Sequence, residues 1–191
     1  NKGISHVMEL MLFQGTKKRT ARQLAADTAA IGDNVNAFTS KEYTAYYGVT
    51  LSEYLPRLIE LIGDMLNHSI MDEDALKKEK GVILEEIDMY DDSPEDLVHE
   101  LLQKQVWKDH PLGFLISGEK DVVRRISRDE ILDFMKKHYT ADHMVLSVAG
   151  HFDENEIYVL LEEAFGKVEQ SGEARLAAAR SALDGARPKD S

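Results

Sequence analysis

The sequence contains no cysteine, no long apolar run and no excess of positive charge. Without cysteine the chain can form neither a disulfide nor a thiolate metal site. No stretch approaches the roughly 20 apolar residues that a membrane-spanning helix needs. The net charge of −12 argues against nucleic acid and against anionic membrane surfaces as partners. The same acidity would suit basic peptide substrates, but it also serves solubility alone, and both interpretations stay open.

The length and pattern of the chain indicate one domain of the α+β class. Its 191 residues, 43% of them hydrophobic, are enough for one full core. Most apolar residues recur with helical spacing, while two segments are rich in β-branched and aromatic residues. We therefore expect helices packed on a partly antiparallel β-sheet. We expect residues 1–170 to form this domain and residues 171–191, which lack hydrophobic periodicity, to be a linker or disordered tail.

Capping residues and turn residues divide the domain into elements. The expected strands are 34–39, 43–50 and a buried strand 145–149, and residues 108–120 read as an extended loop. The expected helix N-caps are Ser5, Thr20, Ser93, Ser127 and Asp153. The expected helices are 6–14, a helix from Thr20 to Gly32, 53–66, 72–91, 94–107, a helix from Ser127 to about 138 and one from Asp153 to about 165.

The first predicted helix carries an incomplete metal motif. Zinc peptidases of the inverted type have His-x-x-Glu-His on a helix, where the two His lie on one face and the Glu beside them can take a proton from water. Here His6 and Glu9 are present, but the position of the second His holds Leu10, which has no lone pair. Taken alone, His6 would also fit a hydrogen-bonded core histidine, and Glu9 a solvated helix carboxylate.

The segments around this motif resemble a known family. In order along the chain, they closely resemble the insulinase–pitrilysin family of zinc metallopeptidases, in the branch of the mitochondrial processing peptidase and its bacterial relatives. The resemblance covers roughly residues 1–170 and implies one half-repeat of that family's fold. The segments that carry it are 3–16, 34–44, 76–92, 110–118 and 139–150.

The resemblance implies the residues of a site. The family's third zinc ligand is a Glu about 76 residues beyond the second motif His, which here selects Glu86, counted from Leu10, over its neighbour Glu85. A further family Glu lies seven residues earlier, at Glu79, close to two helical turns from Glu86 and so on the same face. The implied zinc ligands are His6 and Glu86, with Glu9 as general base and Glu79 as a supporting carboxylate. The alternative for Glu79 and Glu86 is the solvated face of a highly charged helix.

The resemblance also implies partners. Asn36, Ala37 and Phe38 are the expected contacts of a peptide or unfolded polypeptide substrate that adds to the sheet as a strand. A second homologous domain or chain would close a chamber around that substrate, and further sheet strands would precede Asn1. The cytoplasm and the mitochondrial matrix are both compatible with this branch.

Two functions remain at this point. One is a zinc-dependent metalloendopeptidase that processes peptides or presequences, weakened or inactivated by Leu10. The other is a non-catalytic homologue that serves as a binding or structural subunit of a peptidase complex. Leu10 itself is compatible with a natural loss and with an engineered one.

Overall fold

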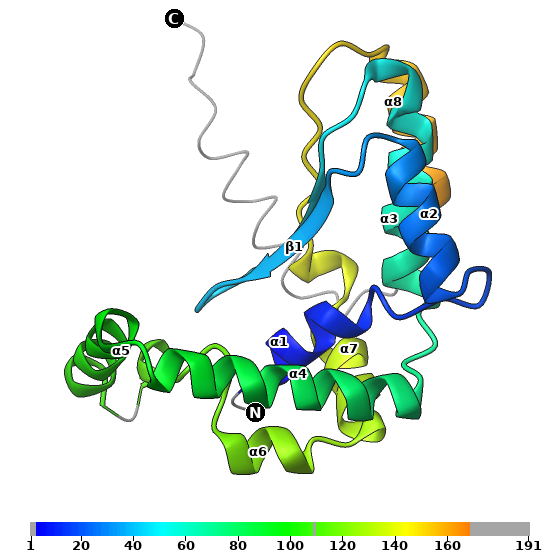
Figure 1. The fold of residues 1–191 in the computed structure, drawn as a ribbon. Coiled ribbons are helices and arrows are strands. Elements are labelled where there is room, and N and C mark those ends of the chain that lie inside the picture. Colours follow the sequence, from blue (N-terminus) through cyan, green and yellow to red (C-terminus); the bar gives the residue numbers. More distant parts are fainter. Residues whose placement is uncertain (1–2, 109, 169–191) are drawn as a thin grey trace, which may run out of the picture.

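The computed structural model describes residues 3–108 and 110–168 as helices arranged around one antiparallel β-hairpin (Figure 1). The expected α+β class is confirmed. None of the helices in these two ranges is long and apolar enough to cross a membrane. The elements are α1 (Ile4–Met11), α2 (Ala21–Ala30), β1 (Val35–Thr39), β2 (Thr44–Gly48), α3 (Leu55–His68), α4 (Glu73–Asp91), α5 (Pro94–Val106), α6 (Lys120–Arg125), α7 (Arg128–His138) and α8 (Glu154–Phe165).

The helices form two groups, one beside the upper part of the hairpin and the other below it (Figure 1). Helices α2, α3 and α8 stand together, with α3 packed against α8. The other group contains α4, α6 and α7, with α1 lying between α4 and β1. Helix α1 therefore contacts both the hairpin and α4.

The hairpin forms as expected. Its antiparallel register pairs Val35 with Gly48 and Thr39 with Thr44. In the turn, the hydroxyl of Ser40 donates to the carbonyl oxygen of Tyr43 at 3.0 Å and accepts from the amide of the same residue at 3.2 Å. The short polar side chain thus closes the turn that follows β1.

Most helix starts are also confirmed. Thr20 and Ser127 form complete capping boxes with Gln23 and Glu130, and Ser93 and Asp153 accept from the first-turn amides of their helices.

The prediction for α1 was wrong in its bounds. This helix begins at Ile4, so Ser5 lies inside its first turn, and it ends at Met11 rather than at 14. The N-cap is Gly3, with φ of 89°, and a Cβ there would lie 2.8 Å from the carbonyl oxygen of Ser117. A glycine can take this conformation and this close approach, so the helix starts earlier than a side-chain cap would place it.

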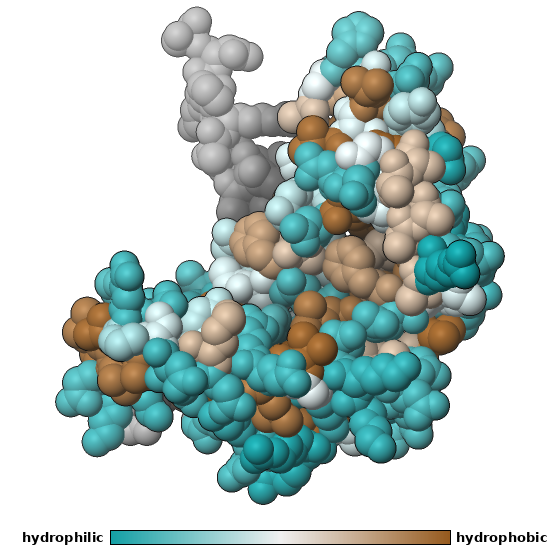
Figure 2. Space-filling model, viewed as in Figure 1, coloured by the Kyte–Doolittle hydropathy of each residue, from teal (hydrophilic) through white to brown (hydrophobic). Residues whose placement is uncertain are grey.

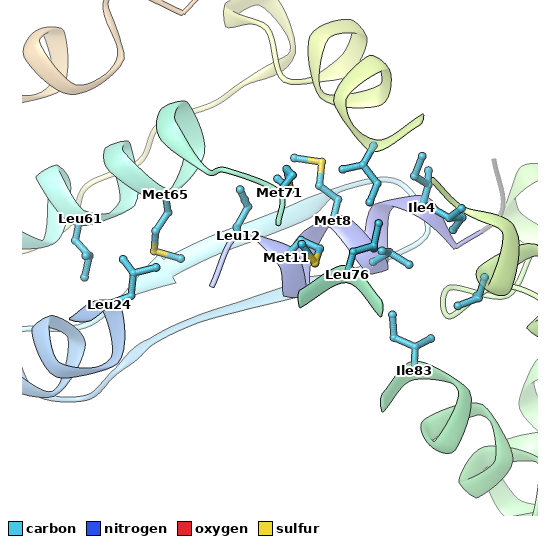
Figure 3. Close-up of a cluster of buried hydrophobic side chains, with 14 of the residues drawn as sticks. Ile4, Met8, Met11, Leu12, Leu24, Leu61, Met65, Met71, Leu76 and Ile83 are labelled. Atoms are coloured by element: carbon cyan, nitrogen blue, oxygen red, sulfur yellow. The ribbon is translucent and has the colours of Figure 1, made fainter. Parts of the chain in front are cut away.

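The hydrophobic core is centred on α1 (Figure 3). Ile4, Val7, Met8 and Met11 are fully buried, and Ile83 of α4 packs against them. Burying one side chain of this size stabilises the fold by about 1.5–3 kcal/mol. The helix that carries the metal motif is therefore held by some of the best-packed residues of the domain.

The prediction of a strand at residues 145–149 was wrong. The segment pairs with no strand among the described residues, and Val145 is 93% exposed. A groove of about 830 Å3, lined on one side by Thr44, Tyr46 and Tyr47, separates it from β2. A segment becomes a strand only when a neighbouring strand satisfies its backbone groups, and β2 and this segment both line the groove without pairing.

Two other expectations have separate outcomes. The extended loop 108–120 contains a short 3-10 turn at Pro111–Gly113, and α6, which begins at Lys120, was not predicted. The predicted tail 171–191 lies outside the described residues.

Candidate metal centre

The fold brings His6 of α1 and Glu86 of α4 together. Their nearest atoms, Nε2 of His6 and Oε2 of Glu86, are 3.7 Å apart. The His6 side chain is 13% exposed and the Glu86 side chain 31% exposed, so the pair lies at the edge of the core. Glu85, its neighbour on the helix, is exposed, whereas Glu86 is half-buried.

The distance between His6 and Glu86 is close to that between two ligands of one metal ion. It is too long for a hydrogen bond. Two ligands that each lie about 2.0–2.2 Å from a tetrahedral zinc are roughly 3.3–3.6 Å apart. The Nδ1 atom of His6 is buried and has no hydrogen-bond partner among the described residues, so no neighbouring group there fixes the tautomer of the ring.

A complete zinc site is nevertheless not formed. Leu10 follows His6 by four residues and packs against the hydrophobic core instead of offering a ligand. Within 3–108 and 110–168, no group of three His, Asp or Glu side chains is placed to hold a metal ion. Zinc sites in proteins use three or four protein ligands, so the two donors present here do not fit a tightly held ion.

Glu9 is a buried carboxylate with a specific partner. It is 7% exposed, and one of its oxygens accepts a short hydrogen bond from the hydroxyl of Thr39, at the end of β1. The Thr39 hydroxyl lies 3.3 Å from that of Thr44, its partner in the hairpin register. The hairpin thus satisfies a carboxylate that would otherwise be costly to bury. Sequence reasoning missed Thr39, although strand alternation from Val35 through Ala37 places it on the half-buried face of β1.

Two tyrosines extend this polar region toward the groove. The phenol oxygens of Tyr46 and Tyr139 are 3.1 Å apart. Burial raises the pKa of Tyr46, and the neighbouring Tyr139 and the charge of Glu9 raise it further. Burial also raises the pKa of Tyr139, while hydrogen bonds from Tyr46 and Thr44 oppose that shift. Both phenols therefore hold their protons at neutral pH.

Glu79 lies two turns before Glu86 on α4. The side-chain amide of Gln14 donates to its Oε1 at 3.0 Å. Partial burial raises the pKa of Glu79. Gln14 follows α1 in the chain, so this hydrogen bond ties the end of the motif helix to α4; sequence reasoning did not identify it, because the contact spans 65 residues.

The predicted substrate contacts lie on β1. Within the described residues, β1 pairs only with β2, which leaves its other edge without a neighbouring strand. The amide of Ala37 donates to the side-chain oxygen of Asn36 at 2.8 Å. Phe38 is 43% exposed and makes edge-to-face contacts with Tyr43 and Tyr47. Asn36 and Phe38 thus lie on the exposed face of the strand, and Ala37 on the half-buried face that it shares with Thr39.

Comparison with known proteins shows the family to which the chain belongs. Residues 1–120 match the family described as "Insulinase (Peptidase family M16)", and residues 125–190 match "Peptidase M16 inactive domain". The chain belongs to peptidase family M16. The resemblance inferred from the sequence is thereby confirmed.

Individual M16 relatives are similar over most of this chain. A Bacillus subtilis (strain 168) protein named "Uncharacterized zinc protease YmxG" is 44% identical over 172 residues, which cover 90% of this chain and 42% of the relative. The β-subunit of the mitochondrial-processing peptidase of Blastocladiella emersonii is 35% identical and is covered to 38%, with 92% of this chain aligned. The crystal structure of a protease from Helicobacter pylori superposes with a TM-score of 0.84 at 23% identity, over 90% of this chain and 42% of that one.

These comparisons also show how much of each relative's length the chain covers. It spans less than half the length of the relatives that it matches. Relatives with the fold occur both among bacterial zinc proteases and among mitochondrial processing peptidases.

Proposed function

We propose that this chain is the motif-bearing part of an M16 zinc metalloendopeptidase, with a metal site weakened by Leu10. The observation that carries the proposal is the juxtaposition of His6 and Glu86, 3.7 Å apart although 80 residues separate them in the sequence. The names of the relatives, zinc protease and processing peptidase, support the same activity class. Zinc held by a complete ligand set would supply a bound water molecule with a lowered pKa.

The residues of this chain would divide the remaining work between a strand and a carboxylate. The free edge of β1 would bind an extended peptide through backbone hydrogen bonds, at Asn36, Ala37 and Phe38. Glu9 would accept a proton from the water that attacks the peptide carbonyl. Glu79 would support Glu86 from the same face of α4. A second homologous domain or chain would close the chamber, since the relatives are more than twice as long as the aligned region.

A non-catalytic role is the second candidate. It is favoured by Leu10 and by the absence, in the described part of the chain, of three groups placed to hold a metal. In that role the β1 edge would still bind extended polypeptide, and an active partner would supply the chemistry. The retention of His6, Glu9, Glu79 and Glu86 argues against it, because a site free of selection would be expected to lose more than one residue.

The deciding experiment measures zinc and cleavage together. The complete protein, purified without chelator, and its Leu10→His variant would be assayed for zinc per chain by elemental analysis and for cleavage of an extended peptide. We expect Leu10→His to bind about one zinc per chain and to cleave the peptide in a zinc-dependent manner. The matched control is Leu10→Gln, which is similar in size and polar but has no imidazole. If Leu10→His gains neither zinc nor cleavage over Leu10→Gln, the non-catalytic role becomes the better account.

A further inference from the structure

The Glu9 carboxylate on α1 is hydrogen-bonded to the hairpin. It belongs to α1, is 7% exposed, and accepts from Thr39, which is 30 residues away in the sequence. A buried carboxylate needs donors, and among the described residues the side-chain hydroxyl of Thr39 is its hydrogen-bonding partner. The position of the Glu9 oxygens therefore depends on the register that places Thr39 at the end of β1.

Each threonine hydroxyl has one proton, and this determines which group donates in each hydrogen bond. Thr39 donates its single hydroxyl proton to Oε2 of Glu9. The contact between the Thr39 and Thr44 hydroxyls, at 3.3 Å, then requires Thr44 as donor. The two threonines thus form a relay whose protons point from β2 through β1 to Glu9.

One consequence concerns the second oxygen of Glu9. Thr39 occupies Oε2, so Oε1 remains as the acceptor for another donor. A general base must present its free oxygen within hydrogen-bond reach of the proton that it takes. We propose that Thr39, held by Thr44, is a positioning residue that fixes the Glu9 carboxylate with one oxygen committed to the hairpin and the other free for proton transfer. The catalytic part of this inference rests on the proposed function of Glu9.

A second consequence links the relay to substrate binding. Thr39 lies on the same strand as Asn36, Ala37 and Phe38, one residue beyond the last of them. A peptide that adds to the edge of β1 would order the strand that also holds Glu9. The relay therefore couples the place where an extended peptide would bind to the orientation of the base.

The hydrogen bond can be tested without any activity. A double-mutant cycle would combine Thr39→Val with Glu9→Met and measure the unfolding midpoint of each protein in urea. We expect Thr39→Val to lower the midpoint in the parent but not in the Glu9→Met background, where the hydroxyl has already lost its acceptor. Crystal structures of Thr39→Val and Thr39→Ser should show the Glu9 carboxylate displaced in the first and retained in the second. Additive effects in the cycle, or an unmoved Glu9 in Thr39→Val, would overturn the proposal.

The catalytic consequence is tested in the Leu10→His background of the complete protein. We expect Thr39→Val to lower kcat for peptide cleavage by about 10- to 100-fold with little change in KM, because the base is misplaced. Thr39→Ser should restore most of kcat. Thr50→Val is the matched control, since it removes a threonine hydroxyl that donates to Ile31 at 2.6 Å, away from Glu9. An unchanged kcat in Thr39→Val, or failure of serine to restore it, contradicts the positioning role.

The two proposals fail in different ways. If Leu10→His neither binds zinc nor cleaves, the proposed function is lost, and the stability cycle and the crystal structures alone decide whether Thr39 positions Glu9. If Leu10→His cleaves but Thr39→Val cleaves equally well, the proposed function stands and the inference about Thr39 is wrong.

Discussion

The Nε2 atom of His6 and the Oε2 atom of Glu86 lie 3.7 Å apart, one on α1 and the other on α4. Because α1 is buried in the core, this separation is fixed by packing and not by a direct bond between the two side chains. The same packing holds Leu10 against the core at the position where the motif would require a ligand. The pair is thus close to the spacing expected of two zinc ligands, and Leu10 offers no further donor beside it.

The role of Glu86 can be separated from that of its neighbour. In the Leu10→His background, Glu86→Gln should weaken zinc binding at least about 100-fold, because loss of a ligand exceeds the 10- to 100-fold cost of losing a supporting contact. Glu85→Gln changes the same charge one residue away on an exposed position, and it should leave zinc affinity unchanged. Titration with zinc against a competing chelator measures both. Equal losses in the two variants would mean that general acidity of α4, and not Glu86, attracts the ion.

Much of the fold follows from local sequence signals. Thr20, Ser93, Ser127 and Asp153 cap helices as expected, because a capping side chain acts on amides two or three residues away. Local signals could not show whether residues 145–149 form a strand. Their apolar character is local, whereas pairing needs a neighbouring strand, and β2 does not pair with them.

The candidate site, too, could be predicted from the sequence only in part. The family spacing favours Glu86 over Glu85, and the structure places Glu86 and not Glu85 beside His6; the ligand role itself stays a prediction. The partner of Glu9 could not be found from the motif, since Thr39 reaches it only after the chain has turned through α2 and into β1. Sequence thus indicates which residue types a site uses, while the contacts that orient them depend on packing between distant elements.

Binding at the edge of β1 predicts a strong dependence on the peptide backbone. In an extended peptide, alternate amides point to opposite sides, so only one set can pair with β1. We expect N-methylation of two amides in that set to weaken binding about 10-fold or more, since each lost hydrogen bond costs about 0.5–1.5 kcal/mol. N-methylation of the intervening amides is the matched control and should have little effect. Fluorescence anisotropy of labelled peptides on the complete protein measures both series, and equal weakening by the two would argue against strand addition.

Glu79 should respond to pH in the direction opposite to an ordinary paired carboxylate. Burial raises its pKa in the folded state, so its ionised form opposes folding above the unfolded-state value of about 4.3. Glu79→Gln removes this charge and keeps an oxygen that can accept from Gln14. We expect the variant to gain stability relative to the parent as the pH rises from 4 to 7, measured by urea unfolding. Exposed Glu85→Gln should show no such trend, and a Glu79→Gln variant that loses stability with rising pH would show that the bond from Gln14 outweighs burial.

Asp64 of α3 should make the fold sensitive to acid. Its side chain is 1% exposed and accepts from Thr16 at 2.8 Å and from Arg19 at 2.6 Å. Burial raises the pKa of Asp64, but the hydrogen bonds from Thr16 and Arg19, with the charges of Arg19 and Lys18, outweigh burial and leave the pKa below its usual value. A depressed folded-state pKa contributes stability that is complete above the unfolded-state value, about 3.9, and is lost as the pH falls through the folded-state value.

Replacing Asp64 should therefore cost stability only where the carboxylate is ionised. We expect Asp64→Asn to lower the free energy of unfolding by about 3 kcal/mol at pH 7, because it breaks a buried ion pair. The deficit should shrink as the pH falls below about 4, where the parent loses the same charge. Asp27→Asn is the matched control: it removes another carboxylate partner of Arg19 that is 38% exposed, and it should cost at most about 1 kcal/mol. A deficit for Asp64→Asn that is independent of pH, or equal to that of Asp27→Asn, would assign the effect to side-chain packing and not to the buried charge.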